Sequence, residues 1–179
     1  MNHDSYSDDY IRGILDSVRV IAMVGASANS VRPSYFAMKY LLQKGYKVVP
    51  INPGQAGKEI LGQTVYARLR DVPEPVDMVD IFRASDAVGP IVEDAISIGA
   101  KVVWMQLGVR NDEAARRAEE AGLKVVMNRC PKIEYGRLSG EIAWSGVNRN
   151  TISAKRPKLQ GTGFQRLALR PGLPVQTRK

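Results

Sequence analysis

The stretch VIAMVGASANSVRPS, residues 20–34, decides the fold of this 179-residue chain. Its first residues form an apolar run without polar alternation, which is typical of a strand covered on both faces in a parallel sheet. Gly25 then begins a loop of small residues, and Pro33 suits the first turn of a helix. A strand, a small-residue loop and a helix in this order predict the first half of a βαβ unit.

The same alternation continues along the chain. Further buried strands are expected in the apolar runs at 47–52, 78–82, 101–107 and 124–129. Helix signals separate them: Ser85 and Asp86 open one helix, Asn111 caps another, and glycines end them. Ser7 caps an amphipathic helix before the first strand. The chain therefore predicts an α/β fold, a doubly wound, Rossmann-like parallel five-stranded sheet with helices on both faces; analogy with such folds gives the strand order 3-2-1-4-5.

Composition and charge divide the chain into two parts. Hydrophobic residues make up 44% and charged residues 25%, as in ordinary globular proteins. The net charge is +8, but residues 139–179 hold eight basic residues and one acidic residue, which leaves 18 basic and 17 acidic in residues 1–138. We therefore expect a folded domain over 1–138 and a basic extended C-terminal tail over 139–179. A nearly neutral domain does not indicate a nucleic-acid partner.

Several classes of protein are excluded by what the sequence lacks. No apolar run approaches the roughly 20 residues that cross a bilayer, and the acidic N-terminus is unlike a secretory signal. We therefore expect no membrane association and a cytoplasmic protein. Cys130 is the one cysteine and His3 the one histidine. A disulfide within the chain and a zinc site built on several thiolates are excluded, and no metal site is predicted.

The loop at 25–34 is the first candidate for ligand binding. Ligands of open parallel sheets bind beyond the carboxyl ends of the strands, and small residues let backbone amides approach a phosphate at a helix start. Arg32, Pro33 and Ser34 complete this loop. The dinucleotide fingerprint fails here, because Ser27 and Ser30 occupy its second and third glycine positions and strand 47–52 ends in Asn52 rather than an acid. An NAD(P)-type regulator is therefore kept as an alternative.

Seven motifs together resemble a known family. They are VGAS, RPS, INP, ILG-x-x-VY, VDIFR, WMQLGV and RCPKIE, and they follow the predicted strands over roughly residues 10–138. These motifs resemble the small stand-alone CoA-binding domain proteins, which are similar to the CoA-binding domain of succinyl-CoA ligase alpha subunits. The resemblance implies coenzyme A as the ligand.

The resemblance also implies roles for individual residues. The phosphates would lie at Gly25, Ala26 and Ser27, and the adenosine end at Asn52 and Pro53. Phe82 and Arg83 would lie beside the nucleotide, and Leu107, Gly108 and Val109 along the pantetheine arm. From the residues themselves, Arg32, Lys58 and Arg83 are the candidate cations for the additional ribose phosphate of CoA, which the neutral Asn52 does not repel. The ligases carry a lysine where this chain has Gln55.

The expected function is binding of CoA or an acyl-CoA without complete catalytic machinery, because the ligases need an active-site histidine in a further domain. An alternative is a thiol-dependent CoA redox or acyl-carrier role through Cys130, whose pKa Arg129 and Lys132 would lower; the other interpretation is a small residue packed at a strand end. Asp80, in a buried-strand pattern, is either paired in the core or poised for function. Glu134 and Tyr135 are the other reactive candidates, and a homodimer is left open.

Overall fold

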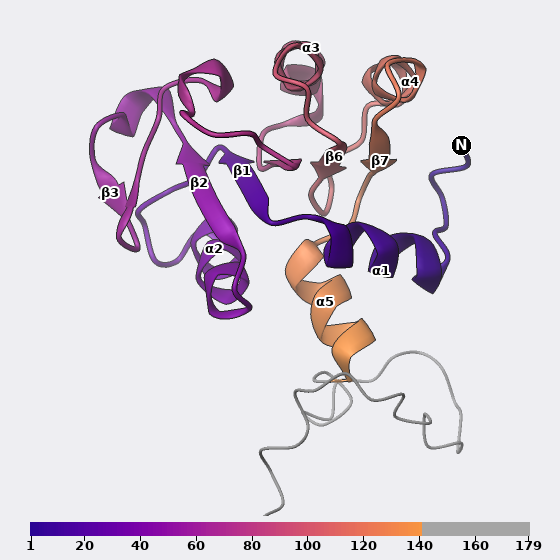
Figure 1. Ribbon diagram of the computed structural model, residues 1–179, viewed down its shortest axis with the longest axis horizontal. Coiled ribbons are helices and arrows are strands. Elements are labelled where there is room, and N and C mark those ends of the chain that lie inside the picture. Colours follow the sequence, from indigo (N-terminus) through magenta and orange to yellow (C-terminus); the bar gives the residue numbers. More distant parts are fainter. Residues whose placement is uncertain (141–179) are drawn as a thin grey trace, which may run out of the picture. The chain divides into compact units, whose positions relative to one another are not determined.

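A five-stranded parallel sheet forms the centre of residues 1–140, the part of the chain that the computed structural model describes (Figure 1). The predicted tail lies outside these residues from position 141 onward. The strands are β1 (Val20–Val24), β2 (Lys47–Ile51), β5 (Met78–Ile81), β6 (Val102–Met105) and β7 (Lys124–Val126). All neighbouring strands pair in parallel. The α/β fold with five long strands, predicted from the apolar runs, is confirmed.

The expected strand order is wrong. The sheet runs β2-β1-β5-β6-β7, so the third long strand pairs with β1 on the side away from β2. In chain order this is 2-1-3-4-5 rather than 3-2-1-4-5. The alternation of strands and helices fits both orders, because each obeys the right-handed crossover rule. The chain adds β2 on one side of β1 and then β5, β6 and β7 on the other side. This change of side makes the carboxyl ends of β1 and β5 the switch point where ligands bind in such folds.

Helices cover both faces of the sheet (Figure 1). One face packs against α1 (Asp8–Ser17), α2 (Pro33–Gln43) and α5 (Pro131–Ser139), and the other against α3 (Val88–Ser97) and α4 (Asp112–Glu120). Side chains alternate between the two resulting cores: Met23 and Trp104 belong to the first, and Ala22 and Val103 to the second. No helix within residues 1–140 has the length and apolar character needed to cross a bilayer.

Two of the predicted helix caps are confirmed and one is wrong. The Ser7 side chain accepts a hydrogen bond from the Tyr10 amide, and Asn111 accepts one from the Ala114 amide. Ser85 caps no helix, because a 3-10 turn, η3 (Ser85–Ala87), precedes α3 and the Ser85 hydroxyl accepts from the Arg110 amide at 3.0 Å. Ser85 therefore connects the loop after β5 to the loop after β6.

A second group of short elements follows β2. These are the 3-10 helix η1 (Pro53–Gln55), the two-residue strands β3 (Glu59–Ile60) and β4 (Gln63–Thr64), which pair antiparallel, and the 3-10 helix η2 (Leu69–Asp71). A single parallel bridge between Ile51 and Tyr66 returns the chain to the end of β2. The residues after Tyr66 therefore lie beside the switch point.

The N-terminal segment covers the open edge of β7. The Tyr6 hydroxyl accepts a hydrogen bond from the Met127 amide at 2.7 Å, and the Tyr10 hydroxyl lies 3.2 Å from both the amide and the carbonyl oxygen of Val125. The side chain of His3 is buried against Tyr6 and Glu119. Edge strands with unpaired amides invite pairing with other chains, and here two tyrosine hydroxyls occupy those amides.

Removing these hydroxyls is expected to destabilise the edge. Tyr6→Phe and Tyr10→Phe should each lower the free energy of unfolding by about 1 kcal/mol, because a buried backbone amide loses its partner. Urea unfolding measures this. Tyr35→Phe is the control, since the Tyr35 hydroxyl has no hydrogen bond within residues 1–140. Equal stability of all three variants would show that water replaces the tyrosines without loss.

Candidate functional site

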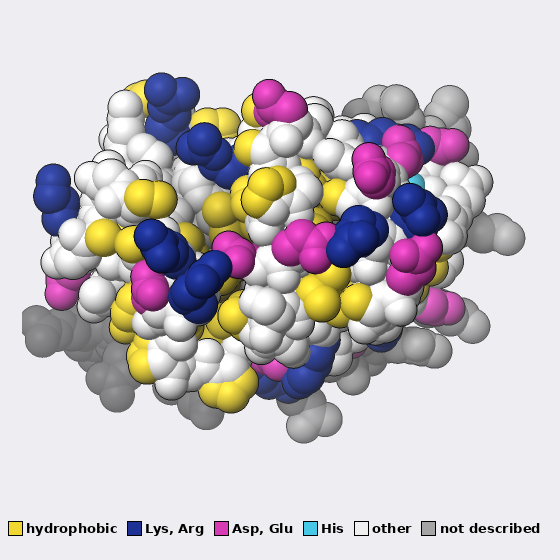
Figure 2. Space-filling view, turned by 90° about the horizontal axis from the view of Figure 1, so that it is seen from above, with side chains coloured by type: hydrophobic (Ala, Val, Ile, Leu, Met, Phe, Trp, Pro, Cys, Tyr) yellow, Lys and Arg dark blue, Asp and Glu magenta, His cyan; other side chains and the backbone are white. Residues whose placement is uncertain are grey.

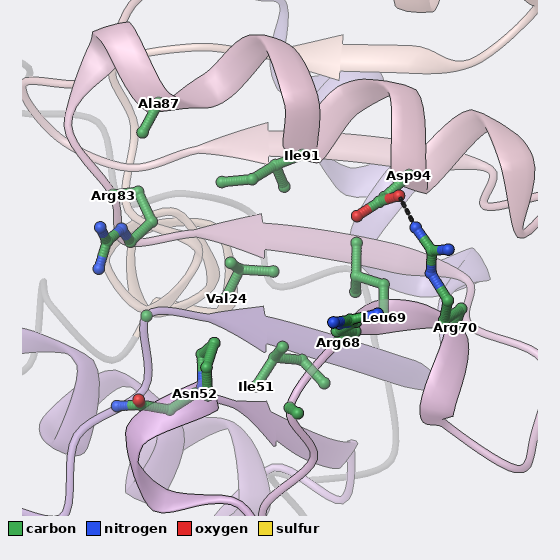
Figure 3. A pocket seen from close by; sticks show the side chains of 13 residues that line it. Val24, Ile51, Asn52, Arg68, Leu69, Arg70, Arg83, Ala87, Ile91 and Asp94 are labelled. Atoms are coloured by element: carbon green, nitrogen blue, oxygen red, sulfur yellow. Dashed lines mark hydrogen bonds and ion pairs between the residues drawn. The ribbon is translucent and has the colours of Figure 1, made fainter.

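A pocket of about 440 Å³ opens at the carboxyl ends of β1 and β2. Its walls come from these two strands, from the segment around η2 and from α3 (Figure 3). The lining residues are Val24, Gly25, Ile51, Asn52, Pro53, Ala67, Arg68, Leu69, Arg70, Arg83, Ala87, Ile91 and Asp94. Because the lining includes Gly25, after β1, and Arg83, in the loop after β5, the pocket borders the switch point of the sheet, where the strand order predicts a ligand.

Gly25 makes the tight turn that leaves β1. Its φ of +88° is in the left-handed region, and a Cβ atom at this position would lie 2.9 Å from the Phe82 carbonyl oxygen. The Gly25 amide donates to the Ile51 carbonyl at 3.0 Å. The next three amides, at residues 26–28, have no hydrogen-bond partner within the described part of the chain. Ala26 is fully buried, so the amides of Ser27 and Ala28 are the ones in this loop that lie on residues open to a ligand.

Asn52 joins the two loops that border the pocket. Its side-chain Nδ2 donates to the Ala26 carbonyl at 2.7 Å, and its Oδ1 accepts from the Gly54 amide at 3.0 Å. Because the carbonyl and amide of a trans peptide point in opposite directions, this bond turns the Ser27 amide away from Asn52. Asn52 therefore acts as a positioning residue for the loop.

Three arginines line the pocket, and they differ in their partners. Arg70 forms an ion pair with Asp94, with 3.0 Å between Nη2 and Oδ1. Arg68 and Arg83 are exposed and have no ion pair among the described residues. In the view from above, several basic side chains stand around a hollow that carries hydrophobic side chains (Figure 2). Two guanidinium groups without carboxylate partners make the pocket suitable for an anion.

The structure separates the predicted site residues into two groups. Gly25, Asn52, Pro53 and Arg83 line the pocket. Outside the lining lie Ala26, Ser27, Arg32, Pro33, Ser34, Lys58, Phe82, Leu107, Gly108 and Val109. Of these, Ala26, Ser34 and Val109 are buried, so they offer a ligand little accessible surface. The Gly108 amide is already bonded to Asn128 Oδ1 at 2.8 Å.

Sequence reasoning missed Arg68 and Arg70. The backbone of Tyr66 pairs with Pro50 and Asn52, and this pairing brings the Ala67-Arg68-Leu69-Arg70 segment to the end of β2. The sequence feature that could have indicated them is the pair of arginines, separated by Leu69, that follows the motif ending in Tyr66. This stretch shows neither helical nor strand periodicity.

Cys130 has no sign of activation. It precedes α5 and is partly buried, and burial raises the pKa of its thiol above the ordinary value. The backbone amides of Ile133 and Lys132 act in the opposite direction but more weakly than burial. The expectation of a lowered pKa is therefore wrong, and a thiol packed at a strand end describes Cys130 better.

Asp80 is a buried carboxyl on the face of the sheet opposite the apolar lining of the pocket. It lies in register with Met23 and Trp104, which belong to the core beneath α1, α2 and α5. Gln106 Nε2 donates to both of its oxygens, at 2.9 and 3.1 Å. Of the other reactive candidates, Glu134 is paired with Arg137, and Tyr135 packs against aromatic rings. The structure thus favours structural roles for Asp80, Glu134 and Tyr135 over reactive ones.

Replacing Gly25 tests the turn. Gly25→Ala should destabilise the protein more than Gly45→Ala, the matched control, because both glycines have φ near +87° but a Cβ at Gly45 meets nothing within 4 Å. The control isolates the cost of the left-handed backbone, about 1–2 kcal/mol. The contact with Phe82 should add about 1–3 kcal/mol in Gly25→Ala. Equal unfolding free energies for the two variants in urea would contradict the close approach.

Asp80 should make stability depend on pH. Burial raises its pKa to about 7 from the ordinary 3.8, so between these values the folded protein retains a proton that the unfolded chain releases. Its contribution to the free energy of unfolding therefore falls as the pH rises from about 4 to about 7. Asp80→Asn should remove this fall and gain up to about 4 kcal/mol over the wild type at pH 8.

Urea unfolding at pH 5 and pH 8 measures this difference. The control is Asp77→Asn: hydrogen bonds from Lys101, Val20 and Arg19 lower the pKa of Asp77, which is therefore ionised at both pH values. The difference between wild type and this control should not change with pH. Parallel pH profiles for wild type and Asp80→Asn would mean that Asp80 is ionised in the folded state.

Comparisons with known proteins agree with this geometry. Residues 19–136 match a family described as "CoA binding domain". A solved structure of a hypothetical protein from Pyrococcus horikoshii OT3 is 43% identical with a TM-score of 0.73, over 77% of this chain and 96% of that chain. The uncharacterized protein YneT of Bacillus subtilis is 33% identical over 125 residues, 70% of this chain and 91% of YneT.

A longer protein matches in part. Subunit alpha of the ADP-forming acetate–CoA ligase I from Pyrococcus furiosus is 34% identical over 87 residues, which are 46% of this chain but 19% of that subunit. The resemblance to the CoA-binding domain of ligase subunits, predicted from seven motifs, is thereby confirmed. With two thirds of its length matched by the family, this chain belongs to the CoA-binding domain family.

Proposed function

We propose that this chain binds coenzyme A or an acyl-CoA, with the nucleotide half in the pocket at the carboxyl ends of β1 and β2. The observation that carries the proposal is a pocket with two arginines that have no carboxylate partner among the described residues, beside the unbonded amides of Ser27 and Ala28. Membership of the CoA-binding domain family supports it. A volume of about 440 Å³ lies within the range of small-ligand pockets.

The pocket offers different surroundings to the two ends of a nucleotide. Val24, Ile51, Leu69 and Ile91 form apolar walls between Arg83 at one end and Asp94 with Arg70 at the other (Figure 3). Apolar walls suit a flat base, and the cationic end next to the Gly25 turn suits phosphates. The diphosphate would therefore lie at Arg83 and the amides that follow Gly25.

Arg68 is the candidate for the 3′-phosphate that distinguishes CoA from dephospho-CoA. In dinucleotide-binding folds the end of the second strand lies beside the adenosine ribose, and an arginine there accommodates an additional phosphate. The Asn52 amide donates to the Tyr66 carbonyl at 2.9 Å, which places the chain segment of Arg68 beside this strand end. Lys58, expected from the sequence to serve this role, lies outside the pocket lining.

The remaining half of CoA would leave the pocket across the ends of β5 and β6. Leu107 directly follows this edge and is 55% exposed, which leaves an apolar side chain for the pantetheine arm.

Binding without turnover is the second half of the proposal. Burial raises the pKa of the Cys130 thiol, and Asp80 is bonded to Gln106 on the opposite face. His3, the one histidine, has a side chain 7% exposed and bonded to Tyr6 at the edge of β7, so it is unsuited to carry a phosphoryl group. The chain also spans 19% of the ligase subunit it resembles, and the ligase activity is that protein's.

Calorimetric titration tests the proposal. We expect CoA to bind at least about ten-fold more tightly than dephospho-CoA or NAD, because a charge-assisted contact to the 3′-phosphate is lost. Arg68→Ala should weaken binding of CoA but not of dephospho-CoA, whereas Arg83→Ala should weaken binding of both.

The control is Arg12→Ala. Arg12 is an exposed residue of α1 outside the pocket and should leave every affinity unchanged. Equal affinity of the wild type for CoA, dephospho-CoA and NAD would overturn the phosphate argument. The protein is also incubated with CoA disulfide and analysed by mass spectrometry. A mixed disulfide with CoA on the wild type but not on Cys130→Ser, formed by thiol–disulfide exchange with release of one CoA thiol, would instead favour the thiol-dependent alternative.

A further inference from the structure

We infer that Asp94 is the residue that selects adenine, by accepting a hydrogen bond from the exocyclic amine of the base. The inference rests on the proposed function, since it names the group that reads the base in the same pocket. Asp94 lies in the middle of α3, and none of the sequence motifs includes it. It is the one carboxylate among the described residues that line the pocket.

The geometry leaves one oxygen of Asp94 available. Arg70 Nη2 holds Oδ1 at 3.0 Å, and Oδ2 has no hydrogen bond among the described residues. The second oxygen turns away from Arg70, into the space bordered by Ile91 and Leu69 (Figure 3). The ion pair therefore fixes the carboxylate and leaves an acceptor directed into an apolar part of the pocket. Arg70 is a positioning residue in this arrangement.

A carboxylate in this place discriminates between purines. An ionised carboxylate only accepts hydrogen bonds, and adenine presents an amine at its six position. Hypoxanthine and guanine present a carbonyl oxygen at the same position, which would face the carboxylate without a proton between them. A polar group that is left without a hydrogen-bond partner in an apolar site costs free energy. The affinity for the mismatched base is therefore lowered by more than the loss of one hydrogen bond.

The charges in the pocket also fix the direction of the nucleotide. Arg83 lies at the end opposite Asp94 (Figure 3). A nucleotide bound in reverse would bring its phosphates to the Asp94–Arg70 ion pair, where the carboxylate offsets the attraction of the guanidinium. Its amine would face the guanidinium of Arg83, and both of these groups donate hydrogen bonds, so the orientation with the phosphates at Arg83 is favoured.

The test compares two probes that differ at the six position of the base. Adenosine 3′,5′-bisphosphate and inosine 3′,5′-bisphosphate are titrated calorimetrically into the wild type, Asp94→Asn and Glu93→Gln. The wild type should prefer the adenine probe by about ten-fold or more, the range expected for a hydrogen bond to a charged group. Asp94→Asn should reduce this preference to about three-fold or less, because a carboxamide donates to a carbonyl as readily as it accepts from an amine.

Glu93→Gln is the matched control. Glu93 is the preceding residue of α3, is paired with Arg117 and lies outside the pocket lining. This variant should keep the wild-type preference. Arg70→Ala, which frees the carboxylate from its partner, should reduce the preference while the chain remains folded by circular dichroism.

The outcomes separate the two proposals. A wild type that binds CoA but does not distinguish the two probes, or an Asp94→Asn variant with an unchanged preference, overturns the role of Asp94 and leaves CoA binding intact. A wild type that binds neither CoA nor either bisphosphate overturns the proposed function, and the inference with it. A reduced preference confined to Asp94→Asn and Arg70→Ala supports the inference.

Discussion

The close approach of the β1 exit turn to β5 is the constraint on which the pocket depends. Gly25 donates to Ile51 at the end of β2, and its Cα faces the Phe82 carbonyl so closely that a Cβ would lie 2.9 Å from that oxygen. Three strands are thereby joined at one point. Asn52 and Arg83 directly follow two of these strands, so their positions relative to the loop are set by the same junction.

The distribution of ion pairs explains why the pocket can attract an anion although the folded part is nearly neutral. Several basic side chains of the folded part form ion pairs with carboxylates, as Lys101 does with Asp77 and Arg110 with Asp4. Among residues 1–140, Arg68 and Arg83 have no such partner, but neither do exposed arginines elsewhere, such as Arg12. Lack of a carboxylate partner alone therefore does not explain why the pocket would attract an anion. What distinguishes the two pocket arginines is their place beside apolar walls, where a charge-assisted bond is stronger than in open solvent.

The fold and four of the thirteen residues that line the pocket could be predicted from the sequence because their signals are local. Five apolar runs specify the long strands, and Gly25, Asn52 and Arg83 directly follow strand ends. The strand order could not be predicted from the sequence, because the alternation of strands and helices does not indicate on which side of β1 the third long strand pairs. Arg68 reaches the pocket through β3, β4 and one bridge, which are too short for periodicity. Asp94 in α3 looks like any solvent-facing charge until Arg70 and the pocket are placed beside it.

The reactive side chains considered from the sequence, among them Cys130, Asp80 and His3, lie outside the pocket lining. Catalysis by an acid, base or nucleophile requires that group to reach the reacting atom. Among residues 1–140, the thiol of Cys130 is shielded, the carboxyl of Asp80 is turned to the opposite core, and His3 is fixed at the far edge beside β7. The pocket lining contributes amides, guanidinium groups and one carboxylate tied to an arginine. Under the proposed function these groups would bind and orient phosphates and a base, and any chemistry at the thiol of CoA would need groups from another source.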